Sequence, residues 1–207
     1  MAAIDPLAIP WDPWRPEDVA RLLDPAGFRW YVAAGWAIDL FLGGKPRSHE
    51  DLEITVPNSR FDEVAEALGR FEIFVITDRR EATPLEQARD RLADTHQTWI
   101  RDPSTRCWCF DVFREPSDGE TWICRRDPSI TLPYAHVIER TENGIPYGRP
   151  EIVLLFKAKH AQEEKNERDF ARTLPALEPA RRAWLRGALE RVHPAHPWLA
   201  ALHRSAA

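Results

Sequence analysis

The chain has 207 residues and a mass of 23.9 kDa, with 43% hydrophobic and 29% charged residues. This length suits one domain with an appendage or two small packed domains, and it excludes a large multidomain assembly. The formal net charge of -5 argues against a protein that coats nucleic acid by bulk electrostatics, although a local basic site is compatible with it.

Neither a membrane span nor a secretory signal is predicted. The apolar segment 30–42 is interrupted by Asp39 and is shorter than the ~20 residues that a membrane span requires. Residues 1–16 lack the basic region and the continuous apolar stretch of a secretory signal. We therefore expect a cytoplasmic protein whose three cysteines are reduced.

The first predicted elements are a helix, a strand and a second helix. Residues 17–23 have helical apolar spacing, with Pro16 suited to the first turn. The short apolar run 30–33 predicts a strand, and the residues after Gly35 have helical spacing as far as Gly43. We therefore expect a strand, a tight turn and a helix at this point.

The next segment, 51–56, alternates apolar and polar residues as a half-buried strand does, which places Asp51 and Glu53 on one face. Further elements are predicted from the same periodicities: a helix at 59–68 and strands at 71–77, 95–101, 106–114 and 122–124.

The pattern becomes helical from Pro150. Apolar spacing between prolines predicts four helices, at 152–160, 163–174, 178–192 and 198–204. The sequence thus predicts an α+β fold with a mixed sheet in residues 1–145 and a packed helical part in residues 146–207.

Three features could form one chemical site: the Gly35 turn, the pair Asp51 and Glu53, and Asp111 on a later strand. Two carboxylates on one strand face repel each other, and a divalent cation relieves that repulsion. Mg2+ prefers oxygen ligands and is often shared between carboxylates and substrate phosphates. The alternative is an acidic strand face that is simply solvated.

The turn before the second helix offers backbone N–H groups and the positive end of a helix dipole to a phosphate. Gly35 lies in this turn and Trp36 follows it, although Trp36 also fits a packing role. Arg47 and His49 precede the acidic strand and add cationic or hydrogen-bonding groups.

These residues resemble the small nucleotidyltransferases of the DNA polymerase beta superfamily, especially the aminoglycoside and lincosamide adenylyltransferase branch. That branch typically has Gly-Gly-Trp-x-(Ile/Val)-Asp, a glycine, a loop with Arg-x-His-x-Asp, and Asp-x-Asp on a strand. Here the matching segments are Ala34-Gly35-Trp36-Ala37-Ile38-Asp39, Gly43, and Arg47-Ser48-His49-Glu50-Asp51-Leu52-Glu53. Ala34 departs from the first glycine, and Glu53 replaces the second aspartate as an accepted variant.

The resemblance is dense over residues 28–57 and continues through Asp111 to Lys157, Lys159 and the pair Asp169-Phe170. Similar proteins have a helix with Lys-x-(Lys/Arg) and a later Asp-Phe pair in that place. The resemblance implies that one lysine reaches a triphosphate, for which helical geometry favours Lys157. A solvated helix end is the alternative.

The resemblance implies an enzyme that transfers a nucleoside monophosphate, AMP from ATP, to a hydroxyl of a small acceptor such as an aminoglycoside- or lincosamide-like antibiotic. It implies a mixed-sheet nucleotidyltransferase core over residues 1–145 and a C-terminal helical part that supplies the acceptor pocket. The implied catalytic and Mg2+-binding residues are Asp51, Glu53 and Asp111, and the implied nucleotide-binding residues are Gly35, Trp36, Arg47, His49 and Lys157.

Two alternatives remain open at this point. A toxin-like nucleotidyltransferase that modifies tRNA or protein would require a basic surface, and nucleic acid would enter only as its acceptor substrate. The C-terminal helices could supply that surface from Lys157, Lys159, Lys165, Arg168, Arg172, Arg181, Arg182 and Arg186. A non-catalytic nucleotide-binding protein is the other alternative, and Ala34 and Glu53 are its only indications.

Overall fold

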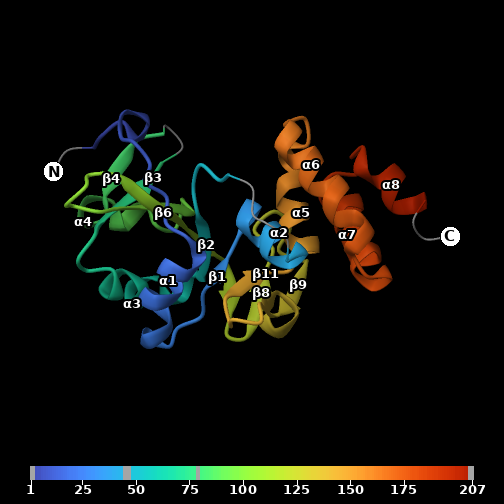
Figure 1. Cartoon of the computed structure of the whole chain (residues 1–207), viewed down its shortest axis with the longest axis horizontal. Helices are drawn as coiled ribbons and strands as arrows, with labels where there is room; N and C mark the ends of the chain where they lie inside the picture. The colour runs from blue at the N-terminus through green and yellow to red at the C-terminus, as the bar shows by residue number, and fades with distance from the viewer. Residues whose placement is uncertain (1–2, 44–47, 78–79, 205–207) are drawn as a thin grey trace. The chain divides into compact units, whose positions relative to one another are not determined.

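The computed structural model describes residues 3–43, 48–77 and 80–204 (Figure 1). The chain forms two compact units, and each consists of two separate stretches of sequence. Unit 1 contains Met1–Val32 and Ser48–Ser117, and unit 2 contains Ala33–Arg47 and Asp118–Ala207. The division of the chain into two domains at residue 145 stays a prediction. The two compact units divide the sequence at other places, because the helix after residue 33 packs against C-terminal helices.

Unit 1 is built on a mixed sheet. Its β2 and β6 pair in parallel, whereas the neighbouring pairs are antiparallel. This arrangement confirms the predicted α+β class and the mixed sheet. The strands follow one another across the sheet in the order β1 (Tyr31–Val32), β2 (Glu53–Pro57), β6 (Trp108–Glu115), β5 (Gln97–Arg101), β3 (Glu72–Ile76) and β4 (Ala82–Pro84).

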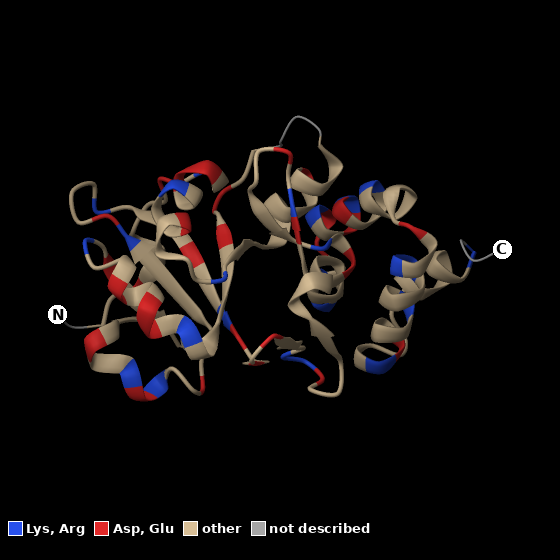
Figure 2. Ribbon diagram, turned by 90° about the horizontal axis from the view of Figure 1, so that it is seen from below, with Lys and Arg blue, Asp and Glu red and all other residues tan. Residues whose placement is uncertain are grey.

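Amphipathic helices accompany this sheet because their apolar residues recur on one face. The helices are α1 (Pro16–Leu23), α3 (Phe61–Ala67) and the single turn α4 (Leu85–Ala88). Val19 and Leu23 of α1 are fully buried, and α1 packs against α3. Figure 2 marks acidic and basic positions along the helices of unit 1.

Tryptophans fill the core beneath the N-terminal segment. Trp108 is fully buried and packs edge-on against Phe74 and Trp99. Its indole Nε1 donates a hydrogen bond of 3.0 Å to the carbonyl oxygen of Pro6. The N-terminal segment is therefore part of the fold of unit 1.

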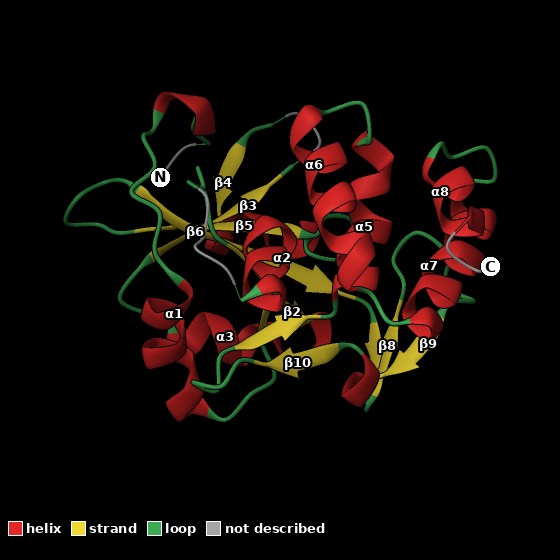
Figure 3. Ribbon diagram, turned by 45° about the vertical axis from the view of Figure 1, so that its right-hand side comes forward, coloured by secondary structure: helices red, strands yellow, loops and turns green. Residues whose placement is uncertain are grey.

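Unit 2 combines short strands with helices (Figure 3). Strand β8 (Thr121–Ile123) follows the short β7 (Ser117–Asp118) and pairs with β9 (Thr131–Pro133). Strands β10 (Ile138–Arg140) and β11 (Pro146–Gly148) form an antiparallel pair. Its helices are α2 (Ala34–Leu42), α5 (Pro150–Lys157), α6 (Glu164–Thr173), α7 (Pro179–Val192) and α8 (Trp198–Arg204).

The predicted helical C-terminus is confirmed, and so are the predicted strand, turn and helix around residues 30–43. The short elements β4, α4 and β9–β11 were not predicted, because three or four residues are too few to show a period. No helix in the described ranges is long and apolar enough to cross a membrane.

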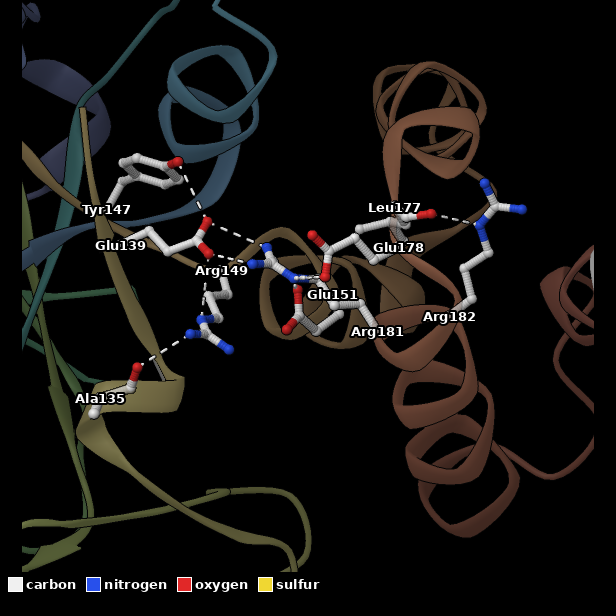
Figure 4. Close-up of polar contacts among 9 residues, drawn as sticks. All are labelled: Ala135, Glu139, Tyr147, Arg149, Glu151, Leu177, Glu178, Arg181 and Arg182. Atoms are coloured by element: carbon white, nitrogen blue, oxygen red, sulfur yellow. Dashed lines mark hydrogen bonds and ion pairs between the residues drawn. The ribbon is translucent and has the colours of Figure 1, made fainter. Parts of the chain in front are cut away.

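A partly buried charge network joins the strands of unit 2 to its helices (Figure 4). The carboxylate of Glu139 on β10 accepts hydrogen bonds from Arg181 on α7, with 3.2 Å to Nη1, and from the hydroxyl of Tyr147 at 3.3 Å. Arg149 lies 3.5 Å from the same carboxylate, and Arg181 also lies 3.8 Å from the buried Glu151. Burial raises the pKa of Glu139, but the hydrogen bond and charge of Arg181 outweigh it, so the pKa is lowered.

We predict that Arg181→Met lowers the free energy of unfolding by about 3 kcal/mol, because it leaves two partly desolvated carboxylates without their main partner. Urea denaturation measures this change. The matched control is Arg168→Met, since Arg168 is 68% exposed and its partner Glu164 is 86% exposed. The control should cost less than about 1 kcal/mol, and equal losses for the two variants would contradict the prediction.

Candidate active site

The centre of the site is the pairing of two carboxylates across parallel strands. Glu53 on β2 is in register with Asp111 on β6, and the backbone N–H of Asp111 donates to the carbonyl of Leu52 at 2.8 Å. Neighbouring strands lie about 4.8 Å apart, so residues in register present their side chains next to each other on one face. Glu53 is half-buried and Asp111 is 3% exposed.

The third predicted carboxylate belongs to the same group. Asp51 lies in the segment before β2 and is half-buried. Its negative charge is one of the influences that raise the pKa of Asp111. The structure therefore brings Asp51 within electrostatic range of Asp111, while Glu53 neighbours Asp111 by register.

The Asp111 carboxyl has a strongly shifted pKa. Burial is the main reason that its pKa is raised to about 7. Gln97 opposes this shift with a hydrogen bond of 2.7 Å from Nε2 to Oδ2, and the nearby indole of Trp99 opposes it further. The other oxygen, Oδ1, is buried and completes no hydrogen bond of ordinary geometry within the described residues. A positive charge at this oxygen would favour the ionised carboxylate.

The donor set suits a hard divalent cation. Carboxylate oxygens are the ligands that Mg2+ prefers, and a buried acceptor such as Oδ1 of Asp111 has a lone pair to offer it. Over residues 3–43, 48–77 and 80–204, no group of three or more His, Cys, Asp or Glu side chains is already arranged as a metal site.

The loop before β2 is only partly described. His49 is half-buried and lies two residues before Asp51 in unit 1. Arg47, the other predicted nucleotide-binding residue of this loop, lies outside the described residues. The roles of both residues stay predictions.

The turn into α2 has a left-handed backbone conformation at the position where the sequence motif has a glycine. Ala34 occupies the place of the first glycine in the motif, and it has a φ of 46°. This left-handed region costs a residue with a Cβ about 1–2 kcal/mol, whereas glycine enters it freely. Gly35 is buried and Trp36 is half-buried in the first turn of α2.

Unit 2 fixes α2 through a buried charge. Asp39 is 4% exposed, and its Oδ1 lies 3.1 Å from Nη2 of Arg172 on α6. The helix also packs against α5 and β11. The predicted residues thus fall into two groups: the carboxylates and His49 in unit 1, and Gly35, Trp36 and Lys157 in unit 2.

Lys157 has protein partners. Its Nζ lies 2.9 Å from Oδ2 of Asp169 and 3.0 Å from Oδ1 of Asn166, both on α6. The side chain of Lys157 is only 11% exposed, and that of Asp169 is 1% exposed. The alternative of a solvated helix end is therefore wrong, because the ammonium group neutralises a buried carboxylate. Its contact with a triphosphate stays a prediction.

Comparisons with known proteins find similarity to adenylyltransferases. Residues 17–106 match the family model for aminoglycoside-2''-adenylyltransferase, a span that includes the α2 turn and β2. The solution structure of the antibiotic-resistance factor ANT(2'')-Ia has a TM-score of 0.55, with 15% identity over 91% of this chain and 95% of that one. The predicted resemblance to the adenylyltransferase branch is confirmed by these matches.

Two further solved structures share the nucleotidyltransferase fold. The lincomycin-bound lincosamide antibiotic adenylyltransferase LnuA has a TM-score of 0.53, with 15% identity over 75% of this chain and 91% of that one. The crystal structure of ANT(2'')-Ia in complex with adenylyl-2''-tobramycin has a TM-score of 0.50, with 15% identity over 92% and 96%. A search of curated proteins finds no match.

Two residues of the candidate site were not predicted. Gln97 and Trp99 lie on β5, and both approach Asp111 from the neighbouring strand. The sequence contained a partial signal, because two predicted strands joined by a short turn form an antiparallel pair. The bulge between Ile100 and Arg101 shifts the register, so counting back from the turn does not identify the partner of Asp111.

We predict that Ala34→Gly leaves stability unchanged or raises it by up to about 1 kcal/mol, because it relieves the left-handed strain and offsets the entropy that glycine loses on folding. Thermal unfolding measures the change. The control is Ala183→Gly, at an exposed position within α7, which should cost about 1 kcal/mol. Equal destabilisation by the two glycines would show that Ala34 is not strained.

We predict that Lys157→Met lowers the free energy of unfolding by about 3 kcal/mol, because the buried Asp169 loses the charge that compensates it. Adding Asp169→Asn should recover part of this loss, and Lys159→Met at the exposed neighbour is the control. Denaturant titration of wild type, Lys157→Met, Asp169→Asn and the double variant gives the coupling between the two residues. A stability within about 0.5 kcal/mol of wild type for Lys157→Met would refute the role of the ion pair.

Proposed function

We propose that this chain is a nucleotidyltransferase that moves AMP from ATP to a hydroxyl group of a small aminoglycoside- or lincosamide-like antibiotic, with Mg2+ as cofactor. The acceptor oxygen forms a bond to the α-phosphorus of ATP, and the bond from that phosphorus to the bridging oxygen of pyrophosphate breaks. The observation that carries the proposal is the register of Glu53 with the buried Asp111. A cytoplasmic location is part of the proposal.

The three carboxylates divide the work in this proposal. Asp51 and Glu53 would hold the cation that accompanies the triphosphate, and Asp111 would act on the acceptor side. When bound, Mg2+ neutralises charge on the phosphates and lowers the pKa of a coordinated hydroxyl. Asp111 would receive the hydroxyl proton at Oδ1, and a carboxyl with a pKa of about 7 suits a general base near neutral pH.

The nucleotide contacts are proposed from the second group of residues. Backbone N–H groups around Gly35 and Trp36 at the start of α2 would bind phosphate oxygens, as helix N-termini do. His49 and Arg47 would add side-chain contacts from the loop before β2. Lys157 would keep its pairing with Asp169 and direct its remaining N–H toward the triphosphate.

The charges of the C-terminal helices support a small acceptor over tRNA. Of the eight basic residues that could form an RNA-binding surface, five pair with carboxylates, and Figure 2 shows blue and red segments interspersed on these helices. A surface neutralised in this way gains little from counterion release. The pairs are Lys157–Asp169, Lys165–Glu163, Arg168–Glu164, Arg172–Asp39 and Arg181–Glu139.

The ligands of the similar structures support the same acceptor class. The LnuA structure is lincomycin-bound, and one ANT(2'')-Ia structure is in complex with adenylyl-2''-tobramycin. A non-catalytic nucleotide-binding protein is less well supported, since burying Asp111 beside two further acids is costly without a function for the group.

The test is transfer of label from ATP labelled at the α-phosphate to tobramycin, lincomycin or bulk tRNA, with and without Mg2+. We expect a labelled antibiotic only when Mg2+ is present. Asp111→Asn should lower the rate by roughly a hundredfold or more, since even residues that merely support metal ligands contribute 10- to 100-fold. Asp90→Asn, at an exposed position, should leave it unchanged. Label on tRNA and on neither antibiotic would favour the toxin-like alternative.

A further inference from the structure

The two oxygens of Asp111 have different surroundings, and β5 creates the difference. Trp99 is in register with Asp111, whereas Gln97 is in register with Phe113, two residues further along β6. Gln97 therefore approaches Asp111 diagonally and donates from Nε2 to Oδ2 at 2.7 Å. This bond is short enough to fix the rotation of the carboxylate.

The second oxygen belongs to a carboxyl on which Trp99, its neighbour by register, also acts. Asp111 Oδ1 and Trp99 Nε1 are both buried, and neither completes a hydrogen bond of ordinary length and angle within the described part of the chain. The Trp99 indole still acts as a weak hydrogen-bonding influence that lowers the pKa of the Asp111 carboxyl. A buried acceptor without an ordinary hydrogen bond is costly to maintain, so Oδ1 is the oxygen with capacity left for a further partner.

Trp99 is held in place by other aromatic rings. Its ring centroid lies 5.0 Å from that of Trp11 and 5.4 Å from that of Trp108, both in edge-on contacts. Trp108 is itself fully buried. The indole is therefore held rigidly near the Asp111 carboxyl, because a change of its rotamer would disturb two packed neighbours.

We propose that Gln97 and Trp99 are positioning residues that select Oδ1 of Asp111 as the oxygen that meets the acceptor hydroxyl and its cation. Gln97 engages Oδ2, and the packed Trp99 indole acts on the same carboxyl from the neighbouring strand. The donor on Oδ2 is a neutral amide, so it orients the carboxylate without neutralising it, whereas an arginine would compete with the cation for the negative charge. The inference rests on the proposed function for the identity of the group at Oδ1.

The test compares wild type with Gln97→Met, which keeps the side-chain length and removes the donor. Gln87→Met, at an exposed position on α4, is the matched control. Gln97→Leu serves as a second variant if the methionine variant does not fold. High-resolution crystal structures report the orientation of the Asp111 carboxylate, and electron paramagnetic resonance reports the affinity for Mn2+ in the absence of turnover.

We expect the Asp111 carboxylate to rotate or take several orientations in Gln97→Met, and the Mn2+ affinity to fall about 10- to 100-fold. The apparent KM for ATP should stay within about twofold of wild type while kcat falls, since the nucleotide contacts are unaffected. Gln87→Met should match wild type in all three measurements.

An unchanged carboxylate orientation in Gln97→Met would overturn the proposal, and so would an unchanged Mn2+ affinity with a rotated carboxylate. The crystal structures also separate this inference from the proposed function. If wild type bound no Mn2+ and transferred no nucleotide, the proposed function would fail, while rotation of Asp111 in the variant would still show that Gln97 sets its orientation.

Discussion

The parallel pairing of β2 with β6 is the constraint on which the candidate site depends. Parallel neighbours cannot be joined by a tight turn, so the chain must leave β2 and return through other elements before β6. The segment that intervenes contains α3, β3, β4 and β5. It places β5 against the free edge of β6, so the same crossover that aligns Glu53 with Asp111 also brings Gln97 and Trp99 to that carboxylate.

Unit 2 depends on a different device, the pairing of acids and bases across helices. Asp39 with Arg172, and Lys157 with Asp169, each connect α6 to another helix of the unit. Such pairs contribute little net stability when formed, but each is costly to break, so they favour one arrangement of the helices over others. The pair Asp39–Arg172 holds α2 against α6, although α2 lies more than a hundred residues before α6 in the sequence.

The sequence was sufficient to predict the local elements and the acidic motif, because periodicity and turn residues act over short distances. It could not predict partners that depend on tertiary packing. Lys157 was expected near a phosphate, yet its pairing with Asp169 depends on how α5 meets α6. Gln97 gave no signal of its own, since its importance arises from a register that a bulge alters. The grouping of α2 with the C-terminal helices is likewise a matter of packing and not of sequence order.

The N-terminal segment has a consequence for how the protein can be handled. Strand β6 begins at Trp108, whereas its pairing with β2 begins only at Asp111. Residues 10–14 instead form backbone hydrogen bonds with the first residues of β6. Trp108 N–H donates to Pro10, while Asp12 and Trp14 donate to Trp108 and Cys109, all at 2.9 Å. A shortened N-terminus would uncover these backbone groups together with an indole-rich surface, and an open, apolar strand edge invites other chains to pair with it. Intermolecular sheet formation, rather than simple loss of folding, would then limit the solubility of such a truncated protein.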